Sequence, residues 1–278
     1  MIINADSAQI YADLAVLSAR PGTEDCARSE HRLFGVRDAA QPCSAAEWAA
    51  LARGEIDRAQ GAGRLPILVG GTGLYLRTLL DGIAPVPPIE PAVRESVRAA
   101  SAEANHGRLA VVDRASAQRV RPSDTTRVAR ALEVVLSSGK TLPEWQAEKT
   151  GGIGDLVTLH PLLLLPPRQW LYERCDRRFA HMLEMGAIDE VRALLTRGLD
   201  PDLPAMRAIG VPEIGRWLSG EWSKEQVLAA GARATRNYAK RQYTWFAHQP
   251  PEDWPRLTDP LDAPGASERA LALLTAPV

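Results

Sequence analysis

The chain has 278 residues, of which 45% are hydrophobic and 24% are charged, with a formal net charge of -1 at pH 7. This composition excludes a disordered chain, and the near-zero charge excludes a surface that attracts nucleic acid over its whole area. The 3 cysteines lie far apart without metal-ligand spacing, which argues against a disulfide framework or a zinc site. No apolar run reaches membrane-spanning length and no signal peptide is predicted, so we expect a cytoplasmic protein.

The first candidate for chemistry is Asp6, which follows a short apolar run at the start of the chain. Residues 1–4 predict a β-strand, and a helix-like segment carrying Gln9 and Tyr11 follows. In an α/β protein, a carboxylate at the carboxyl end of a strand projects into the crevice where ligands bind. An aspartate before a helix is also an ordinary N-cap, and this stretch alone favours the cap.

A second strand with a glycine-rich turn is predicted near residue 70. Residues 65–69 predict a core strand of a parallel sheet, and Gly70-Gly71-Thr72-Gly73 leads into a helical run over residues 74–80. Such a turn can present backbone N–H groups to an anion. The glycines can equally serve only a tight turn, and both interpretations stay open here. Upstream, Ser44 and Glu47 have the spacing of a capping box, which predicts a helix towards Gly61.

The middle of the chain is predicted to be a helical insertion. Prolines between residues 84 and 91 form a stiff connection, and the sequence after it is helical and charged. The turn Arg121-Pro122-Ser123-Asp124 caps a further helix, which places Arg127 and Arg130 on one face with Glu133 one step further. Such a pattern more commonly indicates a solvated helix face with a local ion pair than a binding site.

The C-terminal half combines one predicted strand with long helices. Residues 156–165 predict a second core strand, and residues 170–197 predict one long amphipathic helix with an arginine cluster, including Arg178, near its start. Guanidinium groups beside strand ends are suited to bind a diphosphate. Arginines that are exposed on the surface and bind no ligand are the more common case. Residues 202–210 predict a loop. The last long helix, about 224–246, carries a cationic stripe with interleaved aromatic residues, which is typical of polyanion binding.

Five motifs, in this order, resemble those of the tRNA dimethylallyltransferases (tRNA isopentenyltransferases). The matching stretches span nearly the whole chain: Asn4-Ala5-Asp6-Ser7-Ala8-Gln9-Ile10-Tyr11, Val69-Gly70-Gly71-Thr72-Gly73-Leu74-Tyr75-Leu76, Arg121-Pro122-Ser123-Asp124 with Arg127 and Arg130-Ala131-Leu132-Glu133-Val134, residues 202–210, and Ala239-Lys240-Arg241-Gln242 with Thr244-Trp245. The resemblance implies transfer of a dimethylallyl group from its diphosphate to N6 of the adenosine 3′-adjacent to the anticodon in tRNA, with release of diphosphate.

The resemblance also implies roles for individual residues. Asp6 matches the carboxylate that takes the amine proton, and Arg178 matches the arginine that contacts the diphosphate, usually assisted by Mg²⁺. Residues that match positions contacting the tRNA or its extruded adenine are Ser7, Ala8, Gln9, Thr72, Arg94, Thr126, Arg127, Arg130 and Arg207. No residue is assigned as a metal ligand. The expected partners are the tRNA anticodon stem-loop and dimethylallyl diphosphate, and we expect a monomer that does not bind membranes.

The implied fold is α/β, a P-loop NTPase-like parallel sheet core of the ATP-binding kind with a helical insertion domain. We expect residues 1–85 to form the first part of the core, 86–150 the tRNA-binding insertion, and 151–278 the second part with its basic C-terminal helix. The family begins with a Walker-A-like loop, and Gly70 to Gly73 lacks its lysine. The first strand, loop and first helix are therefore expected to be absent. We favour a misplaced start over a truncated product, because every downstream motif is intact.

Two other functions stay open. A truncated, catalytically impaired tRNA-binding protein of the same family would bind the anticodon arm without binding diphosphate. A small-molecule kinase of the same core fold is disfavoured, because a kinase needs the absent lysine more than a prenyltransferase does. Val211-Pro212-Glu213 also departs from the family, which more often has an aromatic and a basic residue there. Since losing a central strand exposes a sheet edge, we expect poor solubility for residues 1–278 alone.

Overall fold

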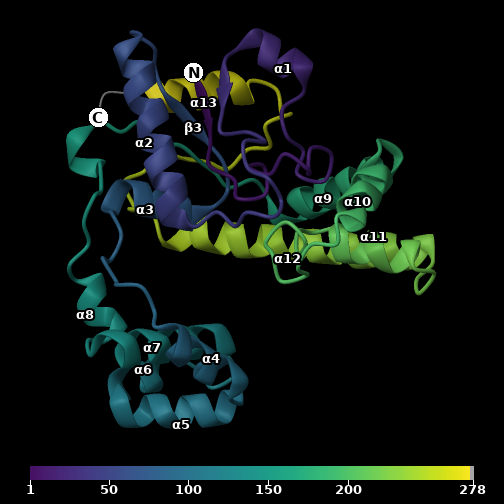
Figure 1. Cartoon of the computed structure of the whole chain (residues 1–278). Helices are drawn as coiled ribbons and strands as arrows, with labels where there is room; N and C mark the ends of the chain where they lie inside the picture. The colour runs from purple at the N-terminus through teal and green to yellow at the C-terminus, as the bar shows by residue number, and fades with distance from the viewer. Residues whose placement is uncertain (276–278) are drawn as a thin grey trace. The chain divides into compact units, whose positions relative to one another are not determined.

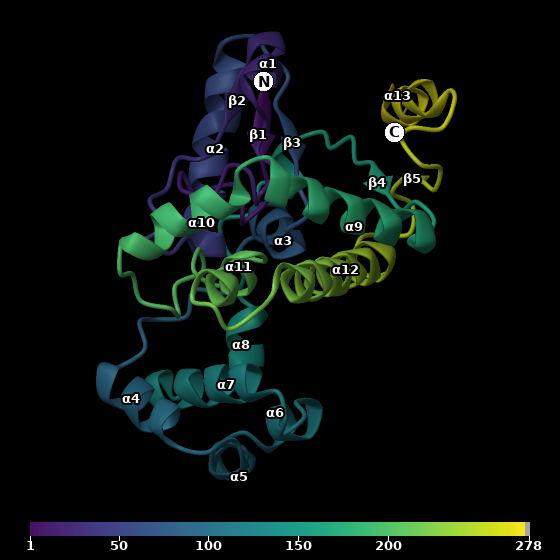
Figure 2. The ribbon, with the colours of Figure 1, turned by 90° about the vertical axis from the view of Figure 1, so that its right-hand side faces the viewer.

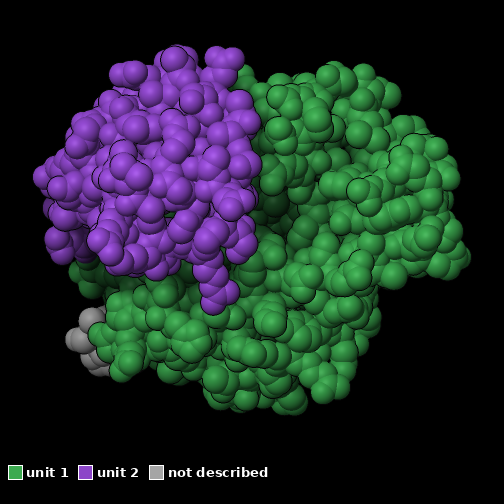
Figure 3. All heavy atoms as spheres, turned by 90° about the horizontal axis from the view of Figure 1, so that it is seen from below, with its two compact units in different colours: residues 1–77, 157–278 green, residues 78–156 purple. Residues whose placement is uncertain are grey.

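The structure is a computed structural model that describes residues 1–275. The described chain forms two compact units, coloured separately in Figure 3. Unit 2 is Thr78–Leu156, and unit 1 consists of Met1–Arg77 together with the described residues from Val157 onward. The segment expected to form a helical insertion, residues 86–150, lies within unit 2.

The N-terminal segment alternates strands and helices, as an α/β fold requires (Figure 1). Its elements are β1 (Ile2–Asn4), α1 (Thr23–Arg28), β2 (His31–Arg32), α2 (Ala45–Gly61), β3 (Ile67–Val69) and α3 (Gly73–Asp81). The expected first strand, the helix that ends at Gly61 and the helix after the glycine-rich turn are all confirmed. The capping box at α2 is also present, with Ser44 Oγ accepting from Glu47 N at 3.2 Å and Glu47 Oε2 accepting from Ser44 N at 2.8 Å.

The strands of this segment form a parallel sheet in the order β2-β1-β3, and Figure 2 shows β1 between its two neighbours. Because the strands run in one direction, their carboxyl ends meet at one edge of the sheet. At that edge β1 leads into Asp6 and β3 leads into Gly70. The topology therefore brings the first two motifs of the sequence together.

The strand β3 has an open edge, and its side chains are more exposed than the sequence predicts. Fractional exposure is 73% for Leu65, 47% for Ile67 and 52% for Val69. Ile67 N donates to Met1 O and Val69 O accepts from Ala5 N, so pairing with β1 occurs on one side only. The same face borders a cavity of about 450 Å³, lined in part by Val69. The expectation of a core strand is confirmed for its pairing and is wrong for its burial, because no described segment covers these side chains.

The segment after Asp6 is a series of turns, which corrects the expected helix-like segment. Its carbonyl groups bond outside the segment: Gly35 N donates to Gln9 O and Arg37 N donates to Ile10 O, both at 2.9 Å. A helix would need those carbonyls for its own N–H groups, so the two arrangements exclude each other.

The C-terminal segment of unit 1 is largely helical. Its elements are β4 (Leu163–Leu164), α9 (Arg168–Glu184), α10 (Ala187–Thr196), α11 (Val211–Leu218), α12 (Lys224–His248), β5 (Arg256–Leu257) and α13 (Ala266–Thr275). The basic helix expected over about 224–246 is confirmed as α12. Figure 2 shows α9 beside α12, where Arg236 Nη1 contacts Asp176 Oδ1 at 2.6 Å and Gly231 leaves room for the Phe179 ring.

Two expectations for this segment are wrong. The helix expected over residues 170–197 is two helices, because Gly186 adopts a φ of 106°, a left-handed conformation that ends α9 before α10 begins. The strand expected over residues 156–165 is reduced to β4, which pairs in parallel with β5. Pro161 and Pro166, on either side of β4, have no N–H to donate to a sheet.

Unit 2 is helical and contains its own apolar core. Its helices are α4 (Pro91–Ala99), α5 (Ala102–Val112), α6 (Arg114–Arg119), α7 (Thr125–Ser138) and α8 (Leu142–Gln146), followed by a short 3-10 turn at Gly154–Leu156. Asp124 caps α7 by accepting from Arg127 N at 3.2 Å, as the sequence predicts. Gly139 ends α7 in the left-handed region. Glu133 departs from the expected charged face: it is 4% exposed and contacts Arg98 Nε at 3.4 Å. Within residues 1–275, no helix is long and apolar enough to cross a bilayer.

We predict that Leu132→Ala lowers the free energy of unfolding of unit 2 by about 2–5 kcal/mol, the usual result of leaving a cavity in a packed core. Leu132 is fully buried in the cluster that also contains Val97 and Leu109. Urea denaturation followed by circular dichroism measures the change. The matched control is Val111→Ala on α5, where the side chain is 85% exposed and the change stays within about 0.5 kcal/mol. Equal effects of the two substitutions would contradict the assigned core.

Candidate active site

The backbone at the end of β1 is fixed by the side chain of Asn4, which is fully buried. Its Nδ2 donates to Asp6 O and to Leu33 O, both at 3.0 Å, and its Oδ1 accepts from Asp6 N at 2.8 Å. Because both the nitrogen and the oxygen of the Asn4 amide are hydrogen-bonded, the peptide groups of Asp6 are held in one conformation. Asn4 belongs to the first motif but was not predicted as a site residue, although an asparagine at the end of an apolar strand is unusual and was the available signal.

The carboxylate of Asp6 is the central charged group of this site. Its Oδ1 accepts from Ala8 N at 2.8 Å, which is the hydrogen bond of an Asx turn. The helix N-cap considered from the sequence is wrong, because no helix follows Asp6. Burial raises the pKa of Asp6 above its ordinary 3.8, while the N–H groups of Ala8 and Gln9 and the charge of Arg178 on α9 lower that pKa in part. A buried carboxylate with a raised pKa is a stronger base than one in water. Asp6 thus has the properties of a proton acceptor whose carboxylate is oriented by a turn.

Hydroxyl groups join the Asp6 turn to the glycine-rich turn. Thr72 Oγ1 accepts from Ser7 N at 2.9 Å and donates to Ser7 Oγ at 3.2 Å, while Thr72 N donates to Ala5 O at 3.1 Å. Tyr238 of α12 lies against the same pair. Burial raises the pKa of Tyr238, the negative charge of Asp6 adds to that effect, and hydrogen bonds with Thr72 and Ser7 oppose it.

The glycines of the second motif are explained by close packing. Gln242 Nε2 of α12 donates to Gly71 O at 2.8 Å, and a Cβ on Gly71 would overlap that amide. A Cβ on Gly73 would lie 2.5 Å from the ring of Trp245, and a Cβ on Gly70 would overlap the backbone of Ala5. The structure accounts for these glycines by a third cause, the close approach of α12 and of the Asp6 turn, and it does not decide between the two interpretations left open by the sequence.

The aromatic residues next to the site hold α2 and α3 against the sheet. Trp48 is fully buried, donates from Nε1 to Asn4 O at 2.8 Å, and stacks on Tyr75 with ring centroids 4.6 Å apart. Tyr75 in turn donates to Cys43 O at 3.3 Å. Burial raises the pKa of Tyr75, so its hydroxyl stays protonated as a donor.

The structure brings some of the predicted site residues together and separates others. Asp6, Ser7, Ala8, Gln9 and Thr72 lie in adjoining turns of unit 1, and Arg178 is close enough for its charge to act on Asp6. Arg207 also belongs to unit 1, where it is exposed in the turns before α11. The remaining residues belong to unit 2 and are exposed on α4 or α7: Arg94, Thr126, Arg127 and Arg130.

Metal-ligating side chains do not gather anywhere in residues 1–275: no group of three or more His, Cys, Asp or Glu could hold an ion. Asp6 is the carboxylate of the described site. Mg²⁺ in phosphate-handling enzymes is commonly held by one or two carboxylates together with substrate phosphates. The described residues therefore provide no cage of their own for the Mg²⁺ that the sequence resemblance implies.

The sequence matches the family described as IPP transferase over residues 9–249, which is most of the chain. The chain belongs to the IPP transferase family. A relative from this family, the tRNA dimethylallyltransferase of Erythrobacter litoralis, is 60% identical over 257 residues, covering 92% of this chain and 81% of that protein.

Solved structures agree with this family assignment. The full-length tRNA isopentenylpyrophosphate transferase of Bacillus halodurans has a TM-score of 0.64 and 30% identity, covering 92% of this chain and 80% of that one. A eukaryotic dimethylallyltransferase, whose structure is described as acting on tRNA, has a TM-score of 0.73, 24% identity and coverages of 88% and 62%. The latter likeness concerns the fold alone. Together they support an α/β fold with parallel sheets and many helices for this chain.

We predict that Gly73→Ala lowers the free energy of unfolding of unit 1 by about 1–3 kcal/mol, because the new methyl group forces Trp245 and α12 to move. Thermal unfolding monitored by tryptophan fluorescence measures the change. Gly107→Ala on α5 is the matched control, since a Cβ there meets nothing within 4 Å. It raises stability by about 0.5–1 kcal/mol through the usual gain of alanine over glycine in a helix. A stabilising Gly73→Ala would contradict the close approach of α12.

Proposed function

We propose that this chain transfers a dimethylallyl group from dimethylallyl diphosphate to N6 of the adenosine 3′-adjacent to the anticodon in tRNA. Family membership and relatives named tRNA dimethylallyltransferase support this reaction. The observation that carries the proposal is the partly buried Asp6 carboxylate at the carboxyl end of β1, whose pKa is raised by desolvation and lowered in part by the charge of Arg178.

In the proposed reaction, the N6 nitrogen attacks the terminal allylic carbon, and the carbon–oxygen bond to the diphosphate breaks. The electron pair of that bond leaves with the diphosphate, and the proton lost by N6 passes to the Asp6 carboxylate. A base of raised pKa holds this proton more firmly, while N–H bonds from the Asp6 turn keep one carboxylate oxygen oriented. The products are the alkylated adenosine and free diphosphate.

Stabilisation of the departing diphosphate is assigned to Arg178, assisted by a hydroxyl donor of the same site. Fixed positive charge and donors aimed at developing negative charge lower a barrier without reorganisation. Ser7 supplies the hydroxyl that is left to donate, because Thr72 Oγ1 already donates to Ser7 Oγ. Mg²⁺, if carried in by the diphosphate, would neutralise part of its charge, and none of the steps assigned to these residues depends on it.

The proposed tRNA contacts divide between the two units. Ser7, Ala8 and Gln9 border the extruded adenine, and Thr72 and Arg207 contact nearby nucleotides from unit 1. Arg94, Thr126, Arg127 and Arg130 contact the anticodon stem from unit 2, which is proposed as the tRNA-binding insertion. Exposed cationic residues of α12, including Arg233, Lys240 and Arg241, add positive charge to the surface of unit 1.

The type of core, the location of the protein and its oligomeric state are also part of the proposal. We assign the sheet with its glycine-rich turn to a P-loop NTPase-type core, supported by the parallel order β2-β1-β3 and the alternation of strands with helices. Since tRNA is present in the cytoplasm, we place the protein there, acting as a monomer.

We predict that Asp6→Ala lowers the rate of transfer by about 10²–10⁴-fold, the usual contribution of a general base. Transfer of labelled dimethylallyl diphosphate to an anticodon stem-loop with adenosine 3′ of the anticodon measures the rate. Stem-loop affinity is expected to stay nearly unchanged, and Asp57→Asn, an exposed residue of α2, is the control. Normal turnover by Asp6→Ala would contradict the assigned base. Stem-loop binding without transfer by the unaltered chain would instead support a tRNA-binding protein.

We predict an acid limb in the pH profile of transfer at a pH above the ordinary aspartate value of 3.8. The base acts only when deprotonated, so activity falls as the pH falls through its raised pKa. The positive charge of Arg178 lowers this pKa, so Arg178→Gln is expected to move the limb to still higher pH as well as slow the reaction. Measurement of kcat/KM against pH for both proteins decides the point. A limb that moves towards acid in the variant would contradict the pairing.

A further inference from the structure

A turn of residues 14–20 in unit 1 lies beside Gln9 and has a defined internal structure. Ala19 N donates to Val16 O and Arg20 N donates to Ala15 O, both at 3.0 Å. Ser18 Oγ also donates to Leu14 O. The N–H groups of residues 15–17 are not used within the turn, and each needs an acceptor.

The acceptor for all three of these N–H groups is the carboxylate of Glu190, on α10. Its Oε1 accepts from Ala15 N and, at 2.9 Å, from Val16 N, and its Oε2 accepts from Leu17 N at 2.9 Å. Hydrogen bonds to an ionised carboxylate are stronger than those to a neutral acceptor. Glu190 is separated from the turn by more than 170 residues, so this is a tertiary clamp and not a local cap.

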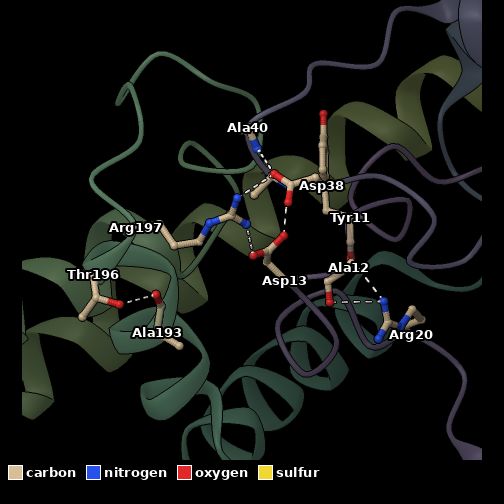
Figure 4. A network of polar contacts seen from close by, with 10 residues as sticks. Tyr11, Ala12, Asp13, Arg20, Asp38, Ala40, Ala193, Thr196 and Arg197 are labelled. Carbon is tan, nitrogen blue, oxygen red and sulfur yellow. Dashed lines mark hydrogen bonds and ion pairs between the residues drawn. The ribbon is translucent and has the colours of Figure 1, made fainter.

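A second charged residue of the α10 region holds the start of the same turn, as Figure 4 shows. Arg197, at the end of α10, pairs with Asp13 and, through Nη2 at 2.7 Å, with Asp38 Oδ1. Asp13 Oδ2 also accepts from Ala39 N at 2.9 Å. Together with Glu190, Arg197 fixes the position of residues 13–17 against α10.

The other end of the turn determines the orientation of Gln9. Gln9 Nε2 donates to Ser18 O at 2.9 Å and to Ala19 O at 3.1 Å. Because the amide nitrogen is committed to the turn, the amide oxygen Oε1 is the part of this side chain left for a ligand. The orientation of Gln9 therefore depends on where the turn is held.

We propose that Glu190 is a positioning residue for the target base: by clamping the turn 14–20 it orients the Gln9 amide so that Oε1 accepts from the 6-amino group of adenine. This inference rests on the proposed function. An acceptor at this place favours adenine, which carries N–H donors at position 6, over hypoxanthine, which carries an acceptor oxygen there. Two acceptors facing each other without a proton between them oppose binding.

The test measures the dissociation constants of two anticodon stem-loops, one with adenosine and one with inosine 3′ of the anticodon, by fluorescence anisotropy with the full chain. Glu190→Gln keeps the size of the side chain but replaces one acceptor oxygen with an amide nitrogen. We expect it to reduce the preference for adenosine roughly tenfold, the scale of one well-placed hydrogen bond. Gln9→Ala should do the same, and the double variant should be no worse than Gln9→Ala alone.

Asp189→Asn is the matched control, because Asp189 is the preceding residue of α10, is exposed, and pairs with Arg192. It should leave the preference unchanged. Amide hydrogen exchange of residues 15–17 should become faster in Glu190→Gln, which reports the clamp without RNA.

Three outcomes overturn the inference, and they are distinguishable. A Glu190→Gln variant that keeps the full adenosine preference, whether or not its amides exchange faster, refutes the positioning role alone. Additive effects in the double variant refute the route through Gln9. An unaltered chain that binds neither stem-loop refutes the proposed function, and the positioning role falls with it.

Discussion

The buried side chain of Asn4 is the interaction on which the order of the candidate site depends. It bonds the peptide groups of Asp6 and of Leu33, while the Asn4 carbonyl accepts from the indole of Trp48. Leaving a buried amide unpaired costs about 1–3 kcal/mol. Any other backbone conformation around Asp6 would break these hydrogen bonds and would therefore be less stable. The Asp6 carboxylate therefore projects from a backbone that the core itself determines.

Around this fixed point, opposing effects set the chemistry of Asp6. Burial favours the protonated acid, whereas backbone N–H groups and Arg178 favour the carboxylate. The helix α9 supplies a group that adjusts this balance, since it carries Arg178. The charge of Asp6 in turn raises the pKa of Tyr238 on α12. The N-terminal sheet thus positions the base, and Arg178 of α9 lowers its affinity for a proton.

Local patterns predicted the elements whose causes are local. The capping box of α2, the Asp124 cap of α7 and the course of α12 depend on neighbouring residues, and all were predictable. The break at Gly186 was not, because the apolar repeat continues through it and only the backbone conformation shows the interruption.

The candidate site was predictable to the extent that topology decides it. Parallel strands bring their carboxyl ends to one edge, and this accounts for the contact between the Asp6 turn and Thr72. The clamp by Glu190 joins segments distant in sequence, and no spacing rule reveals such a pair. The contributions of the predicted residues to RNA binding stay predictions, for those of unit 1 as for Arg94, Thr126, Arg127 and Arg130 of unit 2.

The one-sided pairing of β3 has a consequence for local opening of the protein. Val69 O accepts from Ala5 N, and Ala5 directly precedes Asp6. A strand bonded on one side separates more easily than one held on both, so fraying of β3 releases the peptide group that leads into the site. Any segment that paired with the free side of β3 would stabilise, by mass action, the form in which β3 stays paired with β1. The fraction of molecules with an ordered site is therefore linked thermodynamically to the occupancy of that edge.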